Sequence, residues 1–282
     1  MTQSAERLPA GTSIGEVSLR VADLDRSLDF YAGRLGMRAQ REGDTTTLSS
    51  AAGGDPFIRL QSVGGTTPRP EGVIGLYHFA ILYPDRAALA GAVRSLVDAT
   101  WPFSGFADHG VSEAAYLQDP DGIGIELYAD RPRLLWPRDP TGRIAMYTRM
   151  LDIDDLLAER AASVEPERIG HIHLHVGDLV ESTRFHRDLV GFDVTQDGLP
   201  GAMFLSAGGY HHHVGLNTWA RGRRAQPGAA TLLSWTLRAP DAEAVAAIAG
   251  RLSSHVAADE GAFAYRDPDG NVLVVETAPA VE

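Results

Sequence analysis

Two stretches of the chain share one pattern of hydrophobic and polar positions. Residues 14–37 read IGEVSLRVADLDRSLDFYAGRLGM and residues 169–192 read IGHIHLHVGDLVESTRFHRDLVGF, and the two align without a gap. In each stretch the first eight residues alternate between apolar and polar positions, which is typical of a half-buried strand. The following residues are apolar at a spacing of three to four up to a glycine, which predicts an amphipathic helix. Each stretch therefore predicts a strand followed by a helix.

A second pair of stretches repeats this order of elements. Residues 76–85 (LYHFAILYPD) and 232–241 (LLSWTLRAPD) each predict a strand that leads into an Ala-rich helix. The turn sequence Asp-Pro-Asp-Gly then recurs at 119–122 and 267–270, in both cases before a β-rich run. The chain thus consists of four βαβββ-like modules, and we expect an α+β fold. The modules begin near residues 14, 76, 169 and 232.

The modules divide the chain into two predicted domains. We expect modules one and two to form an N-terminal domain over residues 1–133, and modules three and four to form a C-terminal domain over residues 169–282. The connector, residues 134–168, lies in a region rich in Pro and Arg and has one helical stretch around Met150–Ala162. Its simplest interpretation is a strap that runs over the surface.

Composition removes several kinds of chemistry. The 282 residues include no cysteine, which excludes disulfides, thiolate nucleophiles and cysteine-ligated metal sites. All 25 basic residues are arginine, which excludes a Schiff-base lysine and the lysine of a P-loop. Ten histidines and 37 acidic residues remain. Metal binding or general acid–base catalysis is therefore the chemistry to look for.

Charge and hydropathy limit the partners and the compartment. A net charge of −12 repels a phosphate backbone, and the basic run Arg221–Arg224 is too short to form a nucleic-acid footprint. Glu6, Arg7 and Glu16 interrupt the N-terminal stretch where a signal peptide needs continuous apolar sequence. No window reaches the roughly 18 consecutive apolar residues of a membrane span. We expect a cytoplasmic protein with neither nucleic acid nor membrane as a partner.

Six segments carry a resemblance to a known superfamily. They are residues 75–82 (GLYHFAIL), 108–113 (DHGVSE), 116–122 (YLQDPDG), 125–132 (IELYADRP), 169–175 (IGHIHLH) and 208–213 (GGYHHH). With them, the repeated strand, D-L-x-x-S-x-x-F helix and D-P-D-G turn resemble the vicinal oxygen chelate superfamily, which includes glyoxalase I, bleomycin-resistance proteins and type I extradiol dioxygenases. Over nearly its whole length the chain is most similar to two-domain bacterial catechol-2,3-dioxygenases. This resemblance implies two vicinal-oxygen-chelate domains with curved mixed sheets around a central cavity.

Module two matches the signature of the extradiol enzymes residue by residue. That signature is a His, five to seven residues, an apolar residue and a Tyr, followed by an acid-like residue, a Pro, a Gly and a Glu. The matching residues are His109, Tyr116, Asp119, Pro120, Gly122 and Glu126. Ala115 departs from the pattern, because a larger apolar residue is usual there. The resemblance assigns His109 and Tyr116 to acid–base catalysis and to hydrogen bonds with the substrate oxygens.

The resemblance also implies a metal, held by the first strands of two paired modules and by one last strand. Module two offers His78 and Glu126, whereas module four has serine and valine at the equivalent positions. If modules one and two pair, the third ligand is Glu16 and the site is carboxylate-rich, as in glyoxalase. If modules two and three pair, the third ligand is His171, and the set is the facial triad of a non-haem Fe(II) site. We favour the second set because it gathers the histidines in one cavity.

Further polar residues are expected around the metal. Positions 171, 173 and 175 of one predicted strand are all histidine, so their side chains share a face. In the His211–His213 triplet the two outer side chains share a face and the middle one takes the other. We expect a polar cavity in which such residues orient the metal ligands or replace one of them. The candidates for this role are Glu16, His173, His211 and His213.

The leading hypothesis is a non-haem Fe(II)-dependent extradiol dioxygenase that opens a catechol-like ring. Its partners would be a small aromatic substrate and O2, and a homo-oligomer remains open. The first alternative is a glyoxalase-type isomerase or lyase that uses Mn, Zn or Ni. The second is a metal-free protein of the bleomycin-resistance kind that binds an aromatic ligand. The spacing of His109, Tyr116 and Glu126 favours an enzyme, because a sequestering pocket has no need of that spacing.

Overall fold

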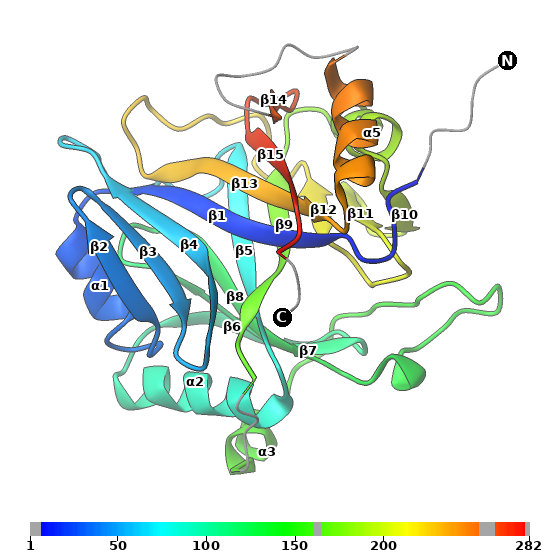
Figure 1. Cartoon of the computed structure of the whole chain (residues 1–282). Coiled ribbons are helices and arrows are strands. Elements are labelled where there is room, and N and C mark those ends of the chain that lie inside the picture. The colour runs from blue at the N-terminus through cyan, green and yellow to red at the C-terminus, as the bar shows by residue number, and fades with distance from the viewer. Residues whose placement is uncertain (1–6, 161–164, 254–262, 280–282) are drawn as a thin grey trace, which may run out of the picture.

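Two mixed β-sheets and several short helices make up the computed structural model of the chain (Figure 1). The structure describes residues 7–160, 165–253 and 263–279. Glu6 and Ala162, the end of the predicted connector helix, lie outside these ranges. The α+β class expected from the sequence is confirmed. No helix among the described residues has the length and apolar character needed to cross a lipid bilayer.

Each module begins with a long strand that leads into a helix. Module one contains β1 (Ser13–Val21), α1 (Leu24–Tyr31), β2 (Arg38–Glu42), β3 (Thr45–Ser50) and β4 (Gly53–Ser62). Module two contains β5 (Gly75–Tyr83), α2 (Arg86–Asp98), β6 (Phe103–Asp108), β7 (Ser112–Gln118) and β8 (Gly124–Asp130). Module three contains β9 (Arg168–His175), α4 (Leu179–Arg184), the π-helix η2 (Phe185–Val190), β10 (Asp193–Gln196), β11 (Ala202–Ser206) and β12 (Val214–Asn217). Module four contains β13 (Thr231–Ala239), α5 (Ala242–Ser253), β14 (Ala264–Arg266) and β15 (Val272–Thr277).

An aspartate explains why the helix starts where it does in all four modules. The side chains of Asp23, Asp85 and Asp178 accept hydrogen bonds from backbone N–H groups in the first turns of α1, α2 and α4. In module four the side chain of Asp241 accepts a hydrogen bond from the backbone N–H of Ala244 at the start of α5, at 2.8 Å. Such a cap satisfies N–H groups that have no partner within the helix, and each contributes about 1 kcal/mol. The repeated Asp-Leu pair of modules one and three is therefore a helix-start signal.

The sheets pair modules from opposite halves of the chain. Among the described residues the larger sheet has the order β10-β11-β12-β9-β5-β8-β7-β6 and the smaller one β14-β15-β13-β1-β4-β3-β2. In the larger sheet β5 and β9 are antiparallel neighbours, so the predicted pairing of modules two and three is confirmed. In the smaller sheet β1 pairs with β13, which joins modules one and four. Strand pairing thus runs between the two predicted domains, whose boundaries remain a prediction.

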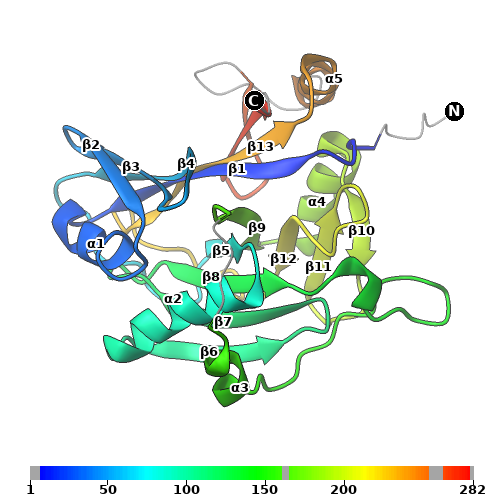
Figure 2. The same ribbon diagram turned by 60° about the horizontal axis from the view of Figure 1, so that its bottom comes forward.

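The two sheets face each other across one hydrophobic core. Figure 2 shows the strand pair β1–β13 lying over the pair β5–β9. Leu19 and Trp235 from the smaller sheet belong to the same buried cluster as Phe79 and Ile172 from the larger one. Side chains on the other face of β5, β8 and β9 are directed away from this core, and that face carries the polar residues described below.

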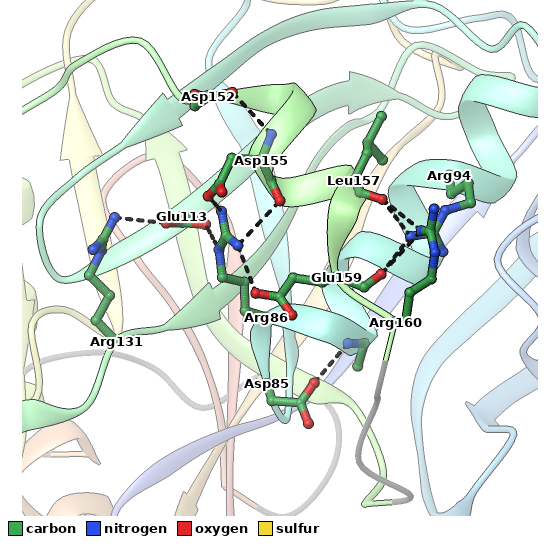
Figure 3. A network of polar contacts seen from close by, with 11 residues as sticks. Asp85, Arg86, Arg94, Glu113, Arg131, Asp152, Asp155, Leu157, Glu159 and Arg160 are labelled. Carbon is green, nitrogen blue, oxygen red and sulfur yellow. Dashed lines mark hydrogen bonds and ion pairs between the residues drawn. The ribbon is translucent and has the colours of Figure 1, made fainter.

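The connector is fastened to module two by arginines (Figure 3). It begins within the 3-10 helix η1 (Arg133–Leu135) and contains the short helix α3 (Ile153–Ala158). Arg86, the first residue of α2, contacts Glu113 on β7 at 2.6 Å and reaches Asp155 and Glu159 of the connector at 2.7 and 2.9 Å. Arg94 donates to two backbone carbonyls at the end of α3. These contacts hold the connector against α2 and β7.

Candidate active site

Three neighbouring strands bring a group of metal-type donors together. His78 lies on β5, Glu126 on β8 and His171 on β9. β5 pairs with β8 on one side and with β9 on the other, so all three side chains meet on one face of the sheet. One donor atom from each residue lies within 4.8 Å of the other two. The Nε2 atoms of both histidines are 3.0 Å from Oε2 of Glu126.

The donor set fits a divalent metal. Nε2 of His78 is buried and has no hydrogen-bond partner among the described residues, although it lies close to Glu126. Burial lowers the pKa of His171, which favours the neutral imidazole that a metal requires. Burial alone raises the pKa of Glu126, but the neighbouring His171 and His78 bring it well below its usual range, so this side chain is a carboxylate. A buried nitrogen without a partner is costly, and a metal ion would satisfy it.

His109 and Tyr116 form a hydrogen-bonded pair beside this group. Nδ1 of His109 lies 2.9 Å from the carbonyl oxygen of Tyr147, which can only accept, so the proton is on Nδ1. In the neutral ring Nε2 is then an acceptor, and the Tyr116 hydroxyl donates to it at 2.8 Å. Burial, reinforced by the charge of Glu126, raises the pKa of Tyr116 well above its usual value. The phenol therefore keeps its proton and can act as a donor.

The histidine triplet lies in the loop between β11 and β12, with all three side chains buried. Nε2 of His211 donates to the carboxylate of Asp130 at 2.9 Å, and Nδ1 of His211 is 2.8 Å from Nδ1 of His212. A neutral His211 accepts at Nδ1, so His212 carries its proton on Nδ1 and leaves Nε2 as an acceptor. Burial lowers the pKa of His212 well below its usual value. The ring of His212 packs 4.1 Å from that of His171, measured between centroids.

Asn217, at the end of β12, fixes two further histidines. Its Oδ1 accepts from the backbone N–H of Trp219 at 3.0 Å and lies 2.6 Å from Nδ1 of His175. The amide NH2 therefore faces Nε2 of His173, 2.9 Å away. Burial lowers the pKa of His173 well below its usual value, so the ring is a neutral acceptor here. Gly215 leaves room for this ring, because a Cβ at that position would lie 2.8 Å from it.

Two of the candidate residues lie away from the metal-type donors. Glu16 is on β1 of the smaller sheet and pairs with Arg59 at 2.7 and 3.0 Å. The structure therefore does not assemble the carboxylate-rich set that includes Glu16. Nδ1 of His213 accepts from the backbone N–H of Ala207, and burial lowers the pKa of this histidine to about 3. His213 lines a separate cavity together with Tyr210.

A cavity of about 410 Å³ opens beside the donor group. His78, Glu126, His109, Tyr116, His173 and His212 line it. Residues 146–148 of the connector form part of the wall, and the carbonyl of Tyr147 orients His109. The connector therefore does more than run over the surface, because residues 146–148 help to line the cavity.

The sequence matches the Glyoxalase/Bleomycin resistance protein/Dioxygenase superfamily over residues 13–127 and 168–275. The chain belongs to this superfamily. Over 271 residues it is 42% identical to the catechol-2,3-dioxygenase of Bacillus subtilis (strain 168), which covers 91% of this chain and 94% of that protein. The resemblance to catechol-2,3-dioxygenases expected from the sequence is thus confirmed. A probable lactoylglutathione lyase of Synechocystis is 32% identical over 117 residues and covers 39% of this chain and 88% of that protein.

Solved structures of the superfamily share this fold. A putative dioxygenase from Bacillus subtilis superposes with a TM-score of 0.66 at 17% identity, over 98% of this chain and 87% of that one. Glyoxalase I from Zea mays superposes with a TM-score of 0.57 at 17% identity, over 94% of this chain and 92% of that one. The vicinal-oxygen-chelate fold that the resemblance implied is confirmed.

Reasoning from the sequence missed His212 and the connector residues of the cavity wall. Alternation within the triplet does separate His212 from its two neighbours, but it does not tell which face meets the cavity. The structure shows that the cavity side belongs to His212, whereas His211 and His213 lie behind it. The connector residues Met146 and Tyr147 carry no motif, so the sequence contained no signal for them.

Proposed function

We propose that this member of the superfamily is an extradiol dioxygenase that opens a catechol-like ring with O2. The observation that carries the proposal is the buried group of His78, Glu126 and His171 beside a cavity that His109 and Tyr116 also line. Similarity to a catechol-2,3-dioxygenase over nearly the whole chain supports the same conclusion.

His78, Glu126 and His171 would hold the metal, proposed to be Fe(II). When bound, a non-haem Fe(II) ion supplies adjacent open positions for both catecholate oxygens and for O2. Two neutral imidazoles and one carboxylate are the ligands typical of that centre. Glu126 contributes the single negative charge of the set, and the strands fix all three donors on one rigid sheet face.

The surrounding residues would hold and move protons. Nε2 of His212 would accept a proton from a catechol hydroxyl. Tyr116 would turn its hydroxyl proton from Nε2 of His109 to a substrate oxygen and stabilise negative charge there. His109 positions the Tyr116 hydroxyl through their hydrogen bond. In the overall reaction a ring C–C bond next to the diol breaks and both atoms of O2 enter the product. No external reductant is needed.

Oxygen uptake tests the proposal. Protein loaded anaerobically with Fe(II) is given catechol and air-saturated buffer, and an oxygen electrode and absorbance follow the reaction. We expect one O2 consumed per catechol and a yellow ring-fission product. His78→Ala and Glu126→Gln should lower the rate by at least about 100-fold, because each removes a donor. Glu16→Gln, in the smaller sheet, is the matched control and should keep the rate. No oxygen uptake across a panel of catechols would contradict the proposal.

Metal content gives a readout that does not depend on turnover. Equilibrium dialysis with Fe(II) or Zn(II) should give close to one ion per chain for the parent protein and for Glu16→Gln. Glu126→Gln should lose most of the bound metal while its circular dichroism stays unchanged. Equal metal binding by Glu126→Gln and the parent protein would refute the proposed ligand set.

A further inference from the structure

Five apolar side chains line the cavity together with the metal-type donors. Histidines, Glu126 and Tyr116 form the polar side, where a diol would lie. The apolar side is built by Val111, Met146, Leu199, Phe204 and Trp219. These residues come from the segment before β7, from the connector, from β11 with the loop before it, and from the segment after β12, so four separate segments contribute to the lining.

The cavity offers no free charge to a substrate substituent among the described residues that line it. Among the described residues that line it, Glu126 is the one acid, and both proposed histidine ligands lie against it. No arginine is among the described residues that line the cavity, and Nε2 of His173 faces the side-chain amide of Asn217, 2.9 Å away. The guanidinium of Arg149 stacks 4.4 Å from the ring centre of Tyr147 and does not belong to the lining residues.

The side-chain amide of Gln196, which also lines the cavity, is held by hydrogen bonds to the connector. Oε1 of Gln196 accepts from the backbone N–H of Met146 at 3.2 Å, and Nε2 donates to the carbonyl of the same residue at 3.4 Å. This pair of bonds holds the connector against β10. It leaves the Met146 side chain to face the cavity as an apolar group.

We propose that the substrate is an uncharged catechol whose ring carries an apolar substituent, and that Met146, Leu199 and Phe204 select that substituent. The inference rests on the proposed function. With the diol at the polar side, a substituent on the ring meets the apolar wall. A methylene group buried there improves binding by about fourfold. A carboxylate at the same place loses its water without gaining a cation, which disfavours it strongly.

Three catechols that share a two-carbon side chain test the selection. They are 4-ethylcatechol, 3,4-dihydroxyphenylacetate and dopamine, whose side chains are neutral, anionic and cationic. We expect kcat/KM for 4-ethylcatechol to exceed that for each charged compound by tenfold or more. A smaller preference over either charged compound overturns the proposal.

A variant pair at the cavity mouth supplies the matched control. Leu199 is 42% exposed and lies in the loop before β11, so a longer polar side chain is accommodated there. Leu199→Arg places a cation beside the substituent and should shrink the preference over 3,4-dihydroxyphenylacetate by at least tenfold. Leu199→Gln is polar but uncharged and should keep that preference. An equal effect of both variants overturns the role of Leu199.

Binding separates a failure of this inference from a failure of the proposed function. Anaerobic calorimetry with the Fe(II)-loaded protein gives a Kd for each compound without turnover. If none of the three is oxidised, the proposed function fails, yet tighter binding of 4-ethylcatechol by tenfold still supports the selection. If all three are oxidised and bound alike, the proposed function stands and the inference fails.

Discussion

At the scale of single residues, groups that can only accept a hydrogen bond set the positions of the protons around the cavity. The carbonyl of Tyr147 puts the proton of His109 on Nδ1, away from Tyr116. The carboxylate of Asp130 does the same for His211 and, through it, for His212. Of these histidines, His109 and His212 line the cavity, and each directs an acceptor nitrogen at its neighbour or at the cavity.

Asp130→Asn should disturb the tautomer of His212. An amide offers an NH2 donor to Nε2 of His211, which moves the proton of His211 to Nδ1 and that of His212 to Nε2. Nitrogen-15 NMR of the zinc-loaded protein, with labelled histidine, should show His212 losing its single tautomer. Oxygen uptake by the Fe(II)-loaded variant should fall by about 100-fold.

An exposed acid provides the control for that experiment. Asp197 pairs with Arg143 at the surface, so Asp197→Asn should leave both the tautomer and the rate unchanged. A His212 spectrum that stays the same in Asp130→Asn would disprove the orienting role of Asp130.

The sequence predicted the site residues correctly where the residues that meet in space are also close together in the chain. Tyr116 and Glu126 lie on the two strands of one β-hairpin, and His109 lies just before its first strand. A short-range sequence pattern is therefore enough to place these side chains together. His212 lies in a loop, and the alternation of side chains along a strand does not predict in which direction a loop side chain points. Its orientation depends on Asp130, 82 positions away, and no pattern within the triplet contains that information.

At the scale of elements, the closing turn of module two is a buried junction with module one. Oδ1 of Asp119 accepts from the backbone N–H groups of Asp121 and Ile123, and Oδ2 accepts from the hydroxyl of Tyr31 on α1. Asp121 accepts from the backbone N–H of Ala22 and contacts Arg26. The Asp-Pro-Asp-Gly turn therefore joins two modules within one half of the chain.

The same turn should make stability depend on pH. Burial raises the pKa of Asp119 from 3.8 to about 7 in the folded protein. The folded state thus binds a proton more tightly than the unfolded state, and this stabilisation is present below pH 4 and lost as pH rises through 7. Asp119→Asn cannot titrate. Relative to that variant, the parent protein should lose on the order of 4 kcal/mol between pH 4 and 7.

Urea unfolding at a series of pH values measures the difference. The comparison between parent and variant removes the contribution of all other titrating groups that the two proteins share. A difference in the free energy of unfolding that stays constant between pH 4 and 7 would rule out a role for Asp119.

The connector should loosen when its arginine anchor is removed. Arg86→Met deletes three ion pairs and leaves Glu113 with Arg131 as its remaining partner. We expect faster hydrogen exchange in α3 and a loss of about 1–3 kcal/mol in stability. Arg138→Met, which removes a bond to a carbonyl at an exposed turn, is the control. Unchanged exchange in α3 would show that other contacts hold the connector.

At the scale of the whole molecule, the two sheets have equivalent central positions with different chemistry. Where the larger sheet has His171, the smaller one has Glu16 bound to Arg59, and Arg238 pairs with Glu276 close by. The repeat allowed the four modules to be recognised from the sequence. It did not fix which modules pair, because all four first strands have the same apolar character. Only the placement of histidines favoured the pairing of modules two and three.

Metal binding should stabilise the whole chain, because the proposed ligands join strands from both of its halves. At a metal concentration 100-fold above Kd, the gain is about 2.7 kcal/mol, which raises Tm by several degrees. Differential scanning fluorimetry of Glu16→Gln should show the same shift as the parent protein. Glu126→Gln should show almost none. A shift that persists in Glu126→Gln would place the metal elsewhere.

The pairing of β1 with β13 also governs how the chain acquires its structure during synthesis. β1 is synthesised about 210 residues before its antiparallel neighbour, residues 231–239, so this edge of β1 has no partner until β13 has been made. β5 likewise waits for β9. Contacts so distant in sequence make folding slow and expose strand edges meanwhile. We therefore expect the chain to be most prone to aggregate while β1 and β5 have been synthesised and their partners β13 and β9 have not.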